Sequence, residues 1–286
     1  MRVTIGLAQI APRLGDRAAN LEIHRAYIER AEQAGVDLLC FPELSLTGYN
    51  LQDLAYTAAV SPTPDDPYFG PLLEASRGID LMVGFVDRDA RGRLFIAAAY
   101  LAAGAVRHIH HKVYLPTYTL FDEGRYFAWG DAIRAFDTRF GRVGMLICED
   151  FWHISPPYLL WLDGADIILL HSASPARGLD SDARPSSVRW VEMMNQAYAG
   201  VFTSFVTHCN RVGYEDGLSF GGGSALYDPD GERIAQGPHY EESLVVATID
   251  THDIHRARYR LPLLRDERTG LTLRELQRIV SKEGRR

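Results

Sequence analysis

Hydrophobic residues recur along this chain in short runs that are rich in β-branched side chains. Such runs, when turn-forming residues bound them, are typical of strands with at least one buried face. Between some of the runs, apolar residues recur instead with the spacing of a helix. The predicted strands are Val3–Ile10, Val36–Phe41, Leu81–Val86, Phe95–Leu101, Val106–Val113, Ile133–Phe136, Val143–Cys148, Ile167–His171, Val201–Thr207, Ser224–Tyr227 and Leu244–Ile249. The predicted helices are about Asn20–Ala34, Pro157–Asp163, Ser187–Tyr198 and Thr272–Ser281.

Turn signals divide the predicted strands into two kinds. Residues 89–92 (Asp-Ala-Arg-Gly) and 228–231 (Asp-Pro-Asp-Gly) carry hairpin signals, and residues 102–104 carry a weaker one. Some strands therefore pair in hairpins while others alternate with helices. This pattern predicts an α/β fold with a mixed sheet, or with two sheets and helices outside them. Because no linker, repeat or shift in composition divides the chain, we expect one domain.

Two segments are expected at a subunit interface or in the core. Residues 158–162 (Tyr-Leu-Leu-Trp-Leu) are apolar on every side, so we expect them to be buried or to lie between subunits. Residues 261–286 form a charged extension, which we expect to be helical at most and to lie at an oligomer interface.

Composition and charge exclude several classes of protein. The 286 residues are 47% hydrophobic and 23% charged, which excludes a disordered chain. The net charge of −7 argues against nucleic acid as the main partner. No apolar run approaches the ~18 residues of a membrane span. The N-terminal residues lack the pattern of a signal peptide, and three cysteines are too few for a disulfide framework, so we expect a cytoplasmic protein.

Lysine is rare in this chain. Only two of the 30 basic residues are lysines, and Lys282 lies in the charged C-terminal extension. Lys112 lies mid-chain among apolar residues. Because the surface charge is supplied almost wholly by arginine, we interpret Lys112 as a functional ammonium group rather than a surface charge at the end of an edge strand.

Four polar residues lie at or just after the ends of predicted strands: Glu43, Lys112, Cys148 and Ser172. In open α/β folds, ligands gather at the carboxyl ends of strands, so these residues are candidates for one site. A nucleophilic thiol needs a base or a nearby cation to yield thiolate. Glu43 can supply the base and Lys112 the cation for Cys148.

Each of these residues also has a structural interpretation. A lone cysteine such as Cys148 is more often a small buried hydrophobe, and we interpret Cys40 and Cys209 in that way. Glu43 alone is more often a surface carboxylate, although its mostly apolar neighbours are an unusual setting for a solvated charge. The carboxylates next to Cys148, Glu149 and Asp150, would disfavour a thiolate if they pointed towards the sulfur.

Histidines suggest two further sites, which we rank lower. Alternation places His108 and His110 on one face of a strand, and a neighbouring His111 adds to a metal-like pattern. Without a nearby set of cysteine or carboxylate ligands, we interpret them as solvated strand residues. Chain order also permits a thiol-protease pair of Cys148 with His153 or His171, but neither histidine has an evident orienting partner.

The glycines at 221–223 are not followed by a helix pattern or by the GK[ST] of a P-loop. We therefore expect a tight approach between strands there rather than a phosphate-binding loop. The sequence contains no Rossmann fingerprint either, so nucleotide binding has no support.

Together these residues carry a family resemblance. Phe41–Leu44 with Thr47–Tyr49, His111–Pro116, and Leu146–Asp150 resemble the three catalytic blocks of the nitrilase superfamily of carbon–nitrogen hydrolases. The resemblance covers about residues 1–260, and block order and spacing agree. Within the superfamily, the chain looks most similar to the glutaminase domain of glutamine-dependent NAD synthetase. Further matching segments are Phe121–Phe127, Ser172–Pro175 and Gly222–Gly231.

The resemblance implies a fold and a mechanism. The family fold is a four-layer αββα sandwich, usually paired as a homodimer, and residues 1–260 would form this hydrolase domain. By position, Cys148 is the nucleophile and Glu43 the general base, and Glu123 helps to position Lys112. Lys112 and the backbone N–H of Glu149 would stabilise the oxyanion. No metal or organic cofactor is needed for this chemistry.

The resemblance also suggests residues that bind the substrate. Tyr49 and Tyr118 match residues that line the glutaminase pocket, and Ser172 and Ser174 belong to a matching block. After that block, residues 176–179 read Ala-Arg-Gly-Leu, where related domains carry an aromatic residue and a Gly-Lys step. This departure makes glutamine itself a doubtful substrate. Arg177 can pair with a substrate carboxylate, or it can be a solvated loop residue.

We therefore expect a thiol amidase that hydrolyses a small, glutamine-like or ω-amide through a thioester. An N-carbamoyl or other small-amide hydrolase is the nearest alternative, and a catalytically silent regulatory subunit of a synthetase is another. The sequence carries no Ser-Gly-Gly loop of an ATP pyrophosphatase, so we do not expect it to make NAD by itself. The expected partners are a small amide, further copies of the chain and a separate ammonia-using synthetase, without nucleic acid or membrane.

Overall fold

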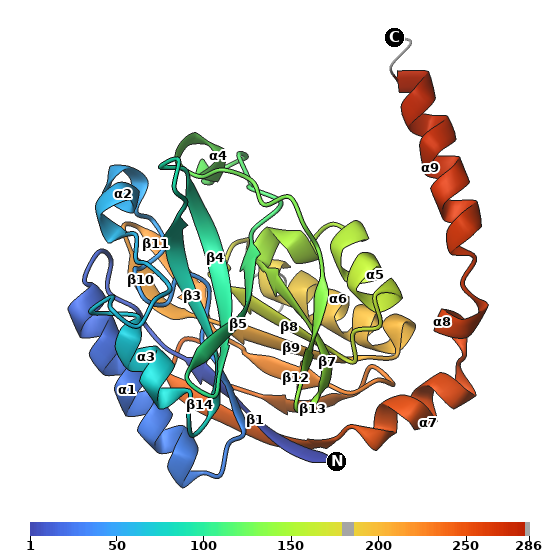
Figure 1. Ribbon diagram of the computed structural model, residues 1–286, viewed down its shortest axis with the longest axis horizontal. Helices are drawn as coiled ribbons and strands as arrows, with labels where there is room; N and C mark the ends of the chain where they lie inside the picture. Colours follow the sequence, from blue (N-terminus) through green and yellow to red (C-terminus); the bar gives the residue numbers. More distant parts are fainter. Residues whose placement is uncertain (179–185, 284–286) are drawn as a thin grey trace.

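The computed structural model describes residues 1–178 and 186–283 (Figure 1). Their strands form two six-stranded sheets and a separate hairpin. In the first sheet the order is β14 (Ser243–Asp250), β1 (Arg2–Gln9), β2 (Leu38–Cys40), β3 (Asp80–Arg88), β4 (Leu94–Ala102) and β5 (Ala105–His111). In the second it is β13 (Arg233–Gln236), β12 (Ala225–Tyr227), β9 (Phe205–Asn210), β8 (Ile167–Ser172), β7 (Gly141–Ile147) and β6 (Ala135–Thr138). The hairpin is β10 (Val212–Glu215) and β11 (Leu218–Gly221).

Helices cover the outer faces of the two sheets. On the first sheet lie α1 (Arg17–Gln33) and α3 (Gly70–Ala75), and on the second lie α5 (Ser155–Leu162) and α6 (Ser186–Phe202) (Figure 1). Three apolar clusters separate the four layers: one between the sheets, one beneath α1 and α3, and one beneath α5 and α6. The predicted four-layer αββα sandwich is confirmed.

Both sheets are mixed, as predicted. In the first sheet β1, β2 and β3 run parallel, and in the second β7, β8 and β9 run parallel. Antiparallel strands flank these centres, and the three predicted turns connect β3 to β4, β4 to β5 and β12 to β13. A parallel centre places the carboxyl ends of its strands at one edge, where side chains from several strands can meet.

Some predicted boundaries are wrong. Val201–Thr207 was expected to be a strand, but Val201 and Phe202 complete α6 and β9 begins only at Phe205. Phe202 is buried with α6 against β9, so tertiary packing outweighs the strand preference of β-branched Val201. The short strands β10, β11 and β13 are not predicted, because four residues each are too few for a hydrophobic pattern to indicate a strand.

The C-terminal extension is helical and only partly packed. After α7 (His252–Arg260) and α8 (Leu263–Asp266), α9 (Thr269–Glu283) lies away from the two sheets (Figure 1). One link to the body joins the hydroxyl of Tyr158 on α5 to Glu267, at 3.1 Å. The exposed apolar side chains of α9 are Leu271, Leu273, Leu276, Ile279 and Val280.

The segment at 158–162 has two faces. Leu160 and Trp161 lie on the buried face of α5, whereas Leu159 is 45% exposed.

Among residues 1–178 and 186–283, no helix combines the length and the apolar character needed to cross a bilayer.

Candidate active site

The ends of strands from both sheets bring the four predicted polar residues into one buried region. Glu43 and Lys112 are completely buried, Ser172 is 3% exposed and Cys148 is 8% exposed. Neither Glu43 nor Lys112 is therefore a surface charge. Hydrogen bonds join the two sheets here: for example, Glu43 accepts one from the backbone N–H of Ala173, and Asp150 accepts one from that of Val113.

Lys112 lies between two carboxylates. β5 ends at His111, one residue before Lys112, whose Nζ is 2.7 Å from Glu43 Oε1 and 2.8 Å from Glu123 Oε1. Burial by itself lowers the pKa of Lys112, but Glu123 and Glu43 raise it more, so this pKa lies well above its usual range. The side chain is therefore a buried ammonium ion with two acidic partners.

Glu43 is held by the turn that follows β2. Its Oε2 accepts a hydrogen bond from the Ala173 N–H at 2.8 Å, and the next residue, Leu44, adopts φ +50°. β3 passes very close beneath this turn at Gly84, where an added Cβ would lie 2.4 Å from the Pro42 carbonyl oxygen. Both oxygens of Glu43 therefore have fixed partners, and the position of the turn depends on the missing side chain at Gly84.

Cys148 begins the short 3₁₀ helix η2 (Cys148–Phe151) rather than ending the strand before it. Its φ is +45°, in the left-handed region that non-glycine residues rarely adopt. Burial, followed by the Glu43 charge, raises the pKa of the thiol well above its usual range, although Lys112 lowers it. The resting sulfur is therefore a thiol, and a base is needed to make it a nucleophile.

Glu123 opens α4 (Glu123–Tyr126) and connects Lys112 with Tyr49. The Tyr49 hydroxyl donates to Glu123 Oε1 at 2.6 Å. Burial raises the pKa of Glu123 to about 7, with Lys112 acting in the opposite direction and Glu43 adding to the rise. Two carboxylates therefore share one ammonium ion, and one of them titrates close to neutrality.

From the sequence, Asp150 is expected only as a charge that would disfavour a thiolate. Instead, its Oδ1 accepts hydrogen bonds from the N–H groups of Val113 and Tyr114, both at 2.9 Å. Its Oδ2 is 2.8 Å from His110 Nε2 and 3.2 Å from the N–H of Ile147. Asp150 thus ties the backbone after Lys112 to the turn that carries Cys148.

The prediction that His110 is a solvated strand residue is wrong. This side chain is 2% exposed and pairs with Asp150, because β5 presents that face to the second sheet. His108 stacks on Phe136 instead, with ring centroids 4.4 Å apart. Across the two described ranges, no group of three or more histidine, cysteine, aspartate or glutamate residues is arranged to hold a metal ion.

Glu149 remains close to the sulfur. Its carboxylate accepts hydrogen bonds from the Tyr118 hydroxyl at 3.0 and 3.1 Å, and burial raises its pKa. Its charge also contributes to the raised pKa of Cys148, so the unfavourable effect expected from the sequence is real for Glu149. Burial and Glu149 together raise the pKa of Tyr118 to about 12.

The other predicted substrate-binding residues lie around this region. Arg177 donates from Nη1 to the Thr119 hydroxyl at 2.7 Å and lies over the Phe121 ring, so it reaches the loop that carries Tyr118. The N–H of Ser174 donates to Asn210 at 3.0 Å. Leu179 of the unusual segment lies outside the described residues.

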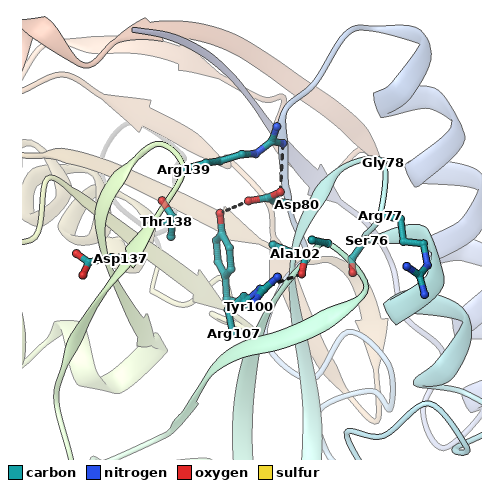
Figure 2. A pocket seen from close by; sticks show the side chains of 11 residues that line it. Ser76, Arg77, Gly78, Asp80, Tyr100, Ala102, Arg107, Asp137, Thr138 and Arg139 are labelled. Atoms are coloured by element: carbon teal, nitrogen blue, oxygen red, sulfur yellow. Dashed lines mark hydrogen bonds and ion pairs between the residues drawn. The ribbon is translucent and has the colours of Figure 1, made fainter.

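Two cavities lie at opposite ends of β3. One of about 340 Å³ is lined by residues that include Tyr49, Phe121 and Glu123, and therefore adjoins the candidate site. The other, of about 420 Å³, lies around Asp80 at the start of β3 (Figure 2). There Asp80 accepts from the Tyr100 hydroxyl at 2.7 Å and pairs with Arg139 at 3.1 Å, far from the four polar residues.

The two histidines of the alternative thiol-protease pairs contact other groups. His171 is fully buried with Nδ1 3.3 Å from the carbonyl oxygen of Phe41, and His153 stacks on Tyr114. Cys40 and Cys209 are completely buried, as expected of small hydrophobes. The glycine run allows the tight approach that was predicted, because a Cβ at Gly222 would lie 2.7 Å from the Gln9 side chain.

The sequence model for the carbon-nitrogen hydrolase family matches residues 4–259. The chain belongs to this family. Among curated relatives, the glutamine-dependent NAD(+) synthetase of Thermotoga maritima is 33% identical over 253 residues, which are 87% of this chain and 42% of the relative. That of Acinetobacter baylyi is 30% identical over 256 residues, with 90% and 45% covered. The chain thus spans less than half the length of the curated relatives it matches.

Solved structures support the same fold. The glutamine-dependent NAD+ synthetase of Acinetobacter baumannii superposes with a TM-score of 0.78 at 27% identity, covering 89% of this chain and 47% of that one. A carbon-nitrogen hydrolase from Helicobacter pylori G27 superposes with a TM-score of 0.81 at 23% identity, covering 96% and 99%. The chain therefore belongs to the carbon-nitrogen hydrolases of the nitrilase superfamily, as the resemblance implied.

Proposed function

We propose that this hydrolase is a thiol amidase with Glu43, Lys112 and Cys148 as its catalytic residues. The observation that carries the proposal is the fully buried Lys112 ammonium, bound by Glu43 and Glu123 at the strand ends where Cys148 also lies. Buried ions are costly, so a lysine held in this way is better explained by chemistry than by stability. The left-handed backbone of Cys148 adds a second sign of a functional site.

The first half-reaction forms a thioester. Glu43 takes the proton from Cys148 Sγ as the sulfur attacks the amide carbonyl carbon. The oxygen then carries a negative charge, which Lys112 and the N–H of Glu149 stabilise; one such donor contributes on the order of 3 kcal/mol. When the intermediate collapses, the C–N bond breaks, Glu43 gives its proton to the nitrogen and ammonia leaves.

The second half-reaction releases the acid. Glu43 takes a proton from a water molecule, whose oxygen attacks the thioester carbonyl carbon. The C–S bond breaks, and the proton returns from Glu43 to the sulfur, which leaves a carboxylic acid and the resting thiol. Glu123 acts as a positioning residue, since it is the second carboxylate that holds the Lys112 ammonium. These steps need no group beyond the side chains and water.

A small glutamine-like or ω-amide is the substrate class that we favour. The curated relatives are glutamine-dependent NAD synthetases, which supports an amide of this kind. Arg177, which contacts Thr119 and Phe121, is the residue that we expect to pair with a substrate carboxylate, while Tyr49, Ser172 and Ser174 would complete the pocket. An N-carbamoyl compound is the second candidate, since its carbonyl group could be attacked by Cys148 and stabilised by Lys112 and the N–H of Glu149 in the same way.

The test is ammonia release from a panel of glutamine, ω-amides, N-carbamoyl amino acids and simple amides. Turnover that disappears in Cys148→Ala, together with a thioester mass on Cys148, supports the proposal. Fluoroacetamide is a suitable trapping reagent, because its acetamide moiety adds to the active-site cysteine of a mutant amidase from Nesterenkonia sp. AN1. A folded protein that neither turns over any amide nor reacts at Cys148 would instead indicate a silent regulatory subunit.

We also propose that residues 261–283 lie at an interface between copies of the chain. A helix of about 15 residues is marginal alone in water, and α9 leaves a row of leucine, isoleucine and valine side chains exposed. Light scattering should show a smaller oligomer after truncation at residue 260; an unchanged mass rules this interface out. A separate ammonia-using synthetase as partner, and a cytoplasmic location, are also proposals.

A further inference from the structure

A second buried ion pair lies on the far side of Tyr49 from Glu123. Arg211 follows β9 and Glu215 ends β10, and their Nη1 and Oε2 atoms are 2.6 Å apart. The two side chains are only 1% and 3% exposed. The Arg211 guanidinium also donates to the Pro12 carbonyl oxygen at 3.2 Å and lies 4.1 Å from the Phe220 ring centroid. Because burying such a pair costs about as much as it returns, stability alone does not account for it.

The second oxygen of Glu215 binds the backbone of the candidate site. Its Oε1 accepts hydrogen bonds from the N–H groups of Tyr49, at 2.9 Å, and Asn50, at 2.6 Å. The preceding residue, Gly48, has φ +79°, and a Cβ there would lie 2.6 Å from Leu14 Cα and 3.0 Å from Glu215 Oε2. The Glu215 carboxylate therefore fixes the chain where it turns into Tyr49, and Arg211 balances its charge.

The side chain of Tyr49 connects this fixed backbone with Glu123 and Lys112. Its hydroxyl is 2.6 Å from Glu123 Oε1, and the same Glu123 oxygen is 2.8 Å from Lys112 Nζ. The Tyr49 ring meets the Phe220 ring edge-on, and Arg211 lies over that same phenylalanine. An unbroken series of buried contacts thus leads from Arg211 through Glu215, Tyr49 and Glu123 to Lys112.

We propose that Arg211 and Glu215 are positioning residues for the amidase site: together they fix the backbone of Tyr49, and through its hydroxyl they hold Glu123 against Lys112. This inference rests on the proposed function. Sequence patterns do not indicate this role, because Arg211 is one of many arginines and Glu215 lies 166 residues from Tyr49. Neither residue touches the reacting atoms.

The test is a double-mutant cycle of Glu215→Gln and Tyr49→Phe. Small displacements of catalytic groups are costly, so we expect Glu215→Gln to lower kcat about 10-fold or more, with a smaller change in KM. In the Tyr49→Phe background the same substitution should cost less than about two-fold, because the link to Glu123 is already broken. Independent, multiplicative losses would overturn the proposed route through Tyr49.

Asp80→Asn provides a matched control. Asp80 is also a buried carboxylate bound to an arginine and a tyrosine, but at the other end of β3 (Figure 2). We expect this variant to lower the melting temperature to a similar degree while leaving kcat unchanged. If both variants lose the same fraction of activity, the Arg211–Glu215 pair acts on stability only and the inference is wrong.

A readout without substrate separates this inference from the proposed function. The rate of Cys148 alkylation by iodoacetamide, followed by peptide mass against pH, reports the charges around the sulfur. We expect Glu215→Gln to move its midpoint by about half a pH unit or more. A shift without amide turnover in the wild-type protein keeps the inference and rejects the amidase. If Glu215→Gln does not fold, Arg211→Lys replaces it, because lysine keeps the charge but lacks the planar guanidinium. This variant must also shift the midpoint of Cys148 alkylation, by a smaller amount. If the midpoint does not move, the inference is wrong.

Discussion

At the scale of single residues, the candidate site depends on charges that share a small, dry space. Glu43 and Glu123 lie within hydrogen-bond distance of the Lys112 ammonium nitrogen, and all three side chains are almost fully buried. In such a setting the protonation state of each group depends on the others. The residue types could be identified from the sequence, but the raised pKa values of Lys112 and Glu123 follow only from the tertiary structure, which buries Glu123 and places two carboxylates beside Lys112.

Lys112→Arg tests whether the ammonium ion is needed. A planar guanidinium is larger than the space between Glu43 and Glu123 and cannot direct a single N–H at the oxyanion. We expect kcat to fall at least about 100-fold, because one oxyanion donor is lost. Steady-state kinetics on the best amide, with circular dichroism to verify folding, measure this. Rates like those of the wild type would remove Lys112 from the mechanism.

The pH dependence of turnover tests the coupled carboxylates. Because burial raises the pKa of Glu123 to about 7, this carboxylate takes up a proton below neutrality, and the Lys112 ammonium then loses one of its two acidic partners. We expect kcat/KM to fall with decreasing pH below about 7. Glu123→Gln removes one of the two negative charges, so its acid limb should lie at lower pH, with a lower maximum rate. An acid limb that does not move would contradict the coupling.

At the scale of elements, close approaches between strands and turns fix where each group points. β3 passes directly beneath the Pro42–Leu44 turn, and β5 delivers Lys112 by ending one residue before it. η2 and Asp150 fasten the Cys148 turn to the backbone after Lys112. The strands themselves could be predicted from alternation, but the 3₁₀ turn at Cys148 could not, since no local pattern distinguishes it from a strand end.

Gly84→Ala tests the close approach of β3. Its Cβ would lie 2.4 Å from the Pro42 carbonyl oxygen and 2.6 Å from the Leu44 nitrogen, so the turn carrying Glu43 must move. We expect a loss of about 1–3 kcal/mol in the free energy of unfolding and a large fall in turnover. Urea denaturation and kinetics measure the two effects.

Gly200→Ala is the control for that substitution. Gly200 lies in α6, where the nearest atom to an added Cβ is the Asp230 carbonyl oxygen at 3.4 Å, an ordinary contact. Alanine is the better helix former, so this variant should keep its activity and most of its stability. Equal losses in both variants would mean that the Gly84 contact does not position Glu43.

At the scale of the whole molecule, three apolar clusters hold four layers together, and several histidines are buried within them. His24, His171 and His208 are all completely or almost completely buried. Burial lowers the pKa of His24 and of His208 to about 4, and that of His171 to about 3. Because the native state keeps these rings neutral, it becomes less stable at pH values at which the rings are protonated in the unfolded chain.

The free energy of unfolding should therefore fall as pH decreases below about 6.5, where the unfolded chain binds protons that the native state excludes. Each of the three histidines contributes a loss of roughly 2 kcal/mol between pH 7 and pH 5. Glu123, whose pKa is raised, changes stability in the opposite direction by about the amount of one histidine. Urea unfolding at both pH values measures the net fall, and stability that does not change or rises would contradict it.

The sequence by itself determined most of the strands, four of the helices and the three catalytic candidates. Periodicity records which face of each element is apolar, and the scarcity of lysine singled out Lys112. Only the tertiary structure decided what Asp150, His110, Arg211 and Glu215 do, since their partners lie up to 199 residues away along the chain. The sequence does not distinguish a charged side chain that is solvated from one that is buried, because tertiary packing decides between the two.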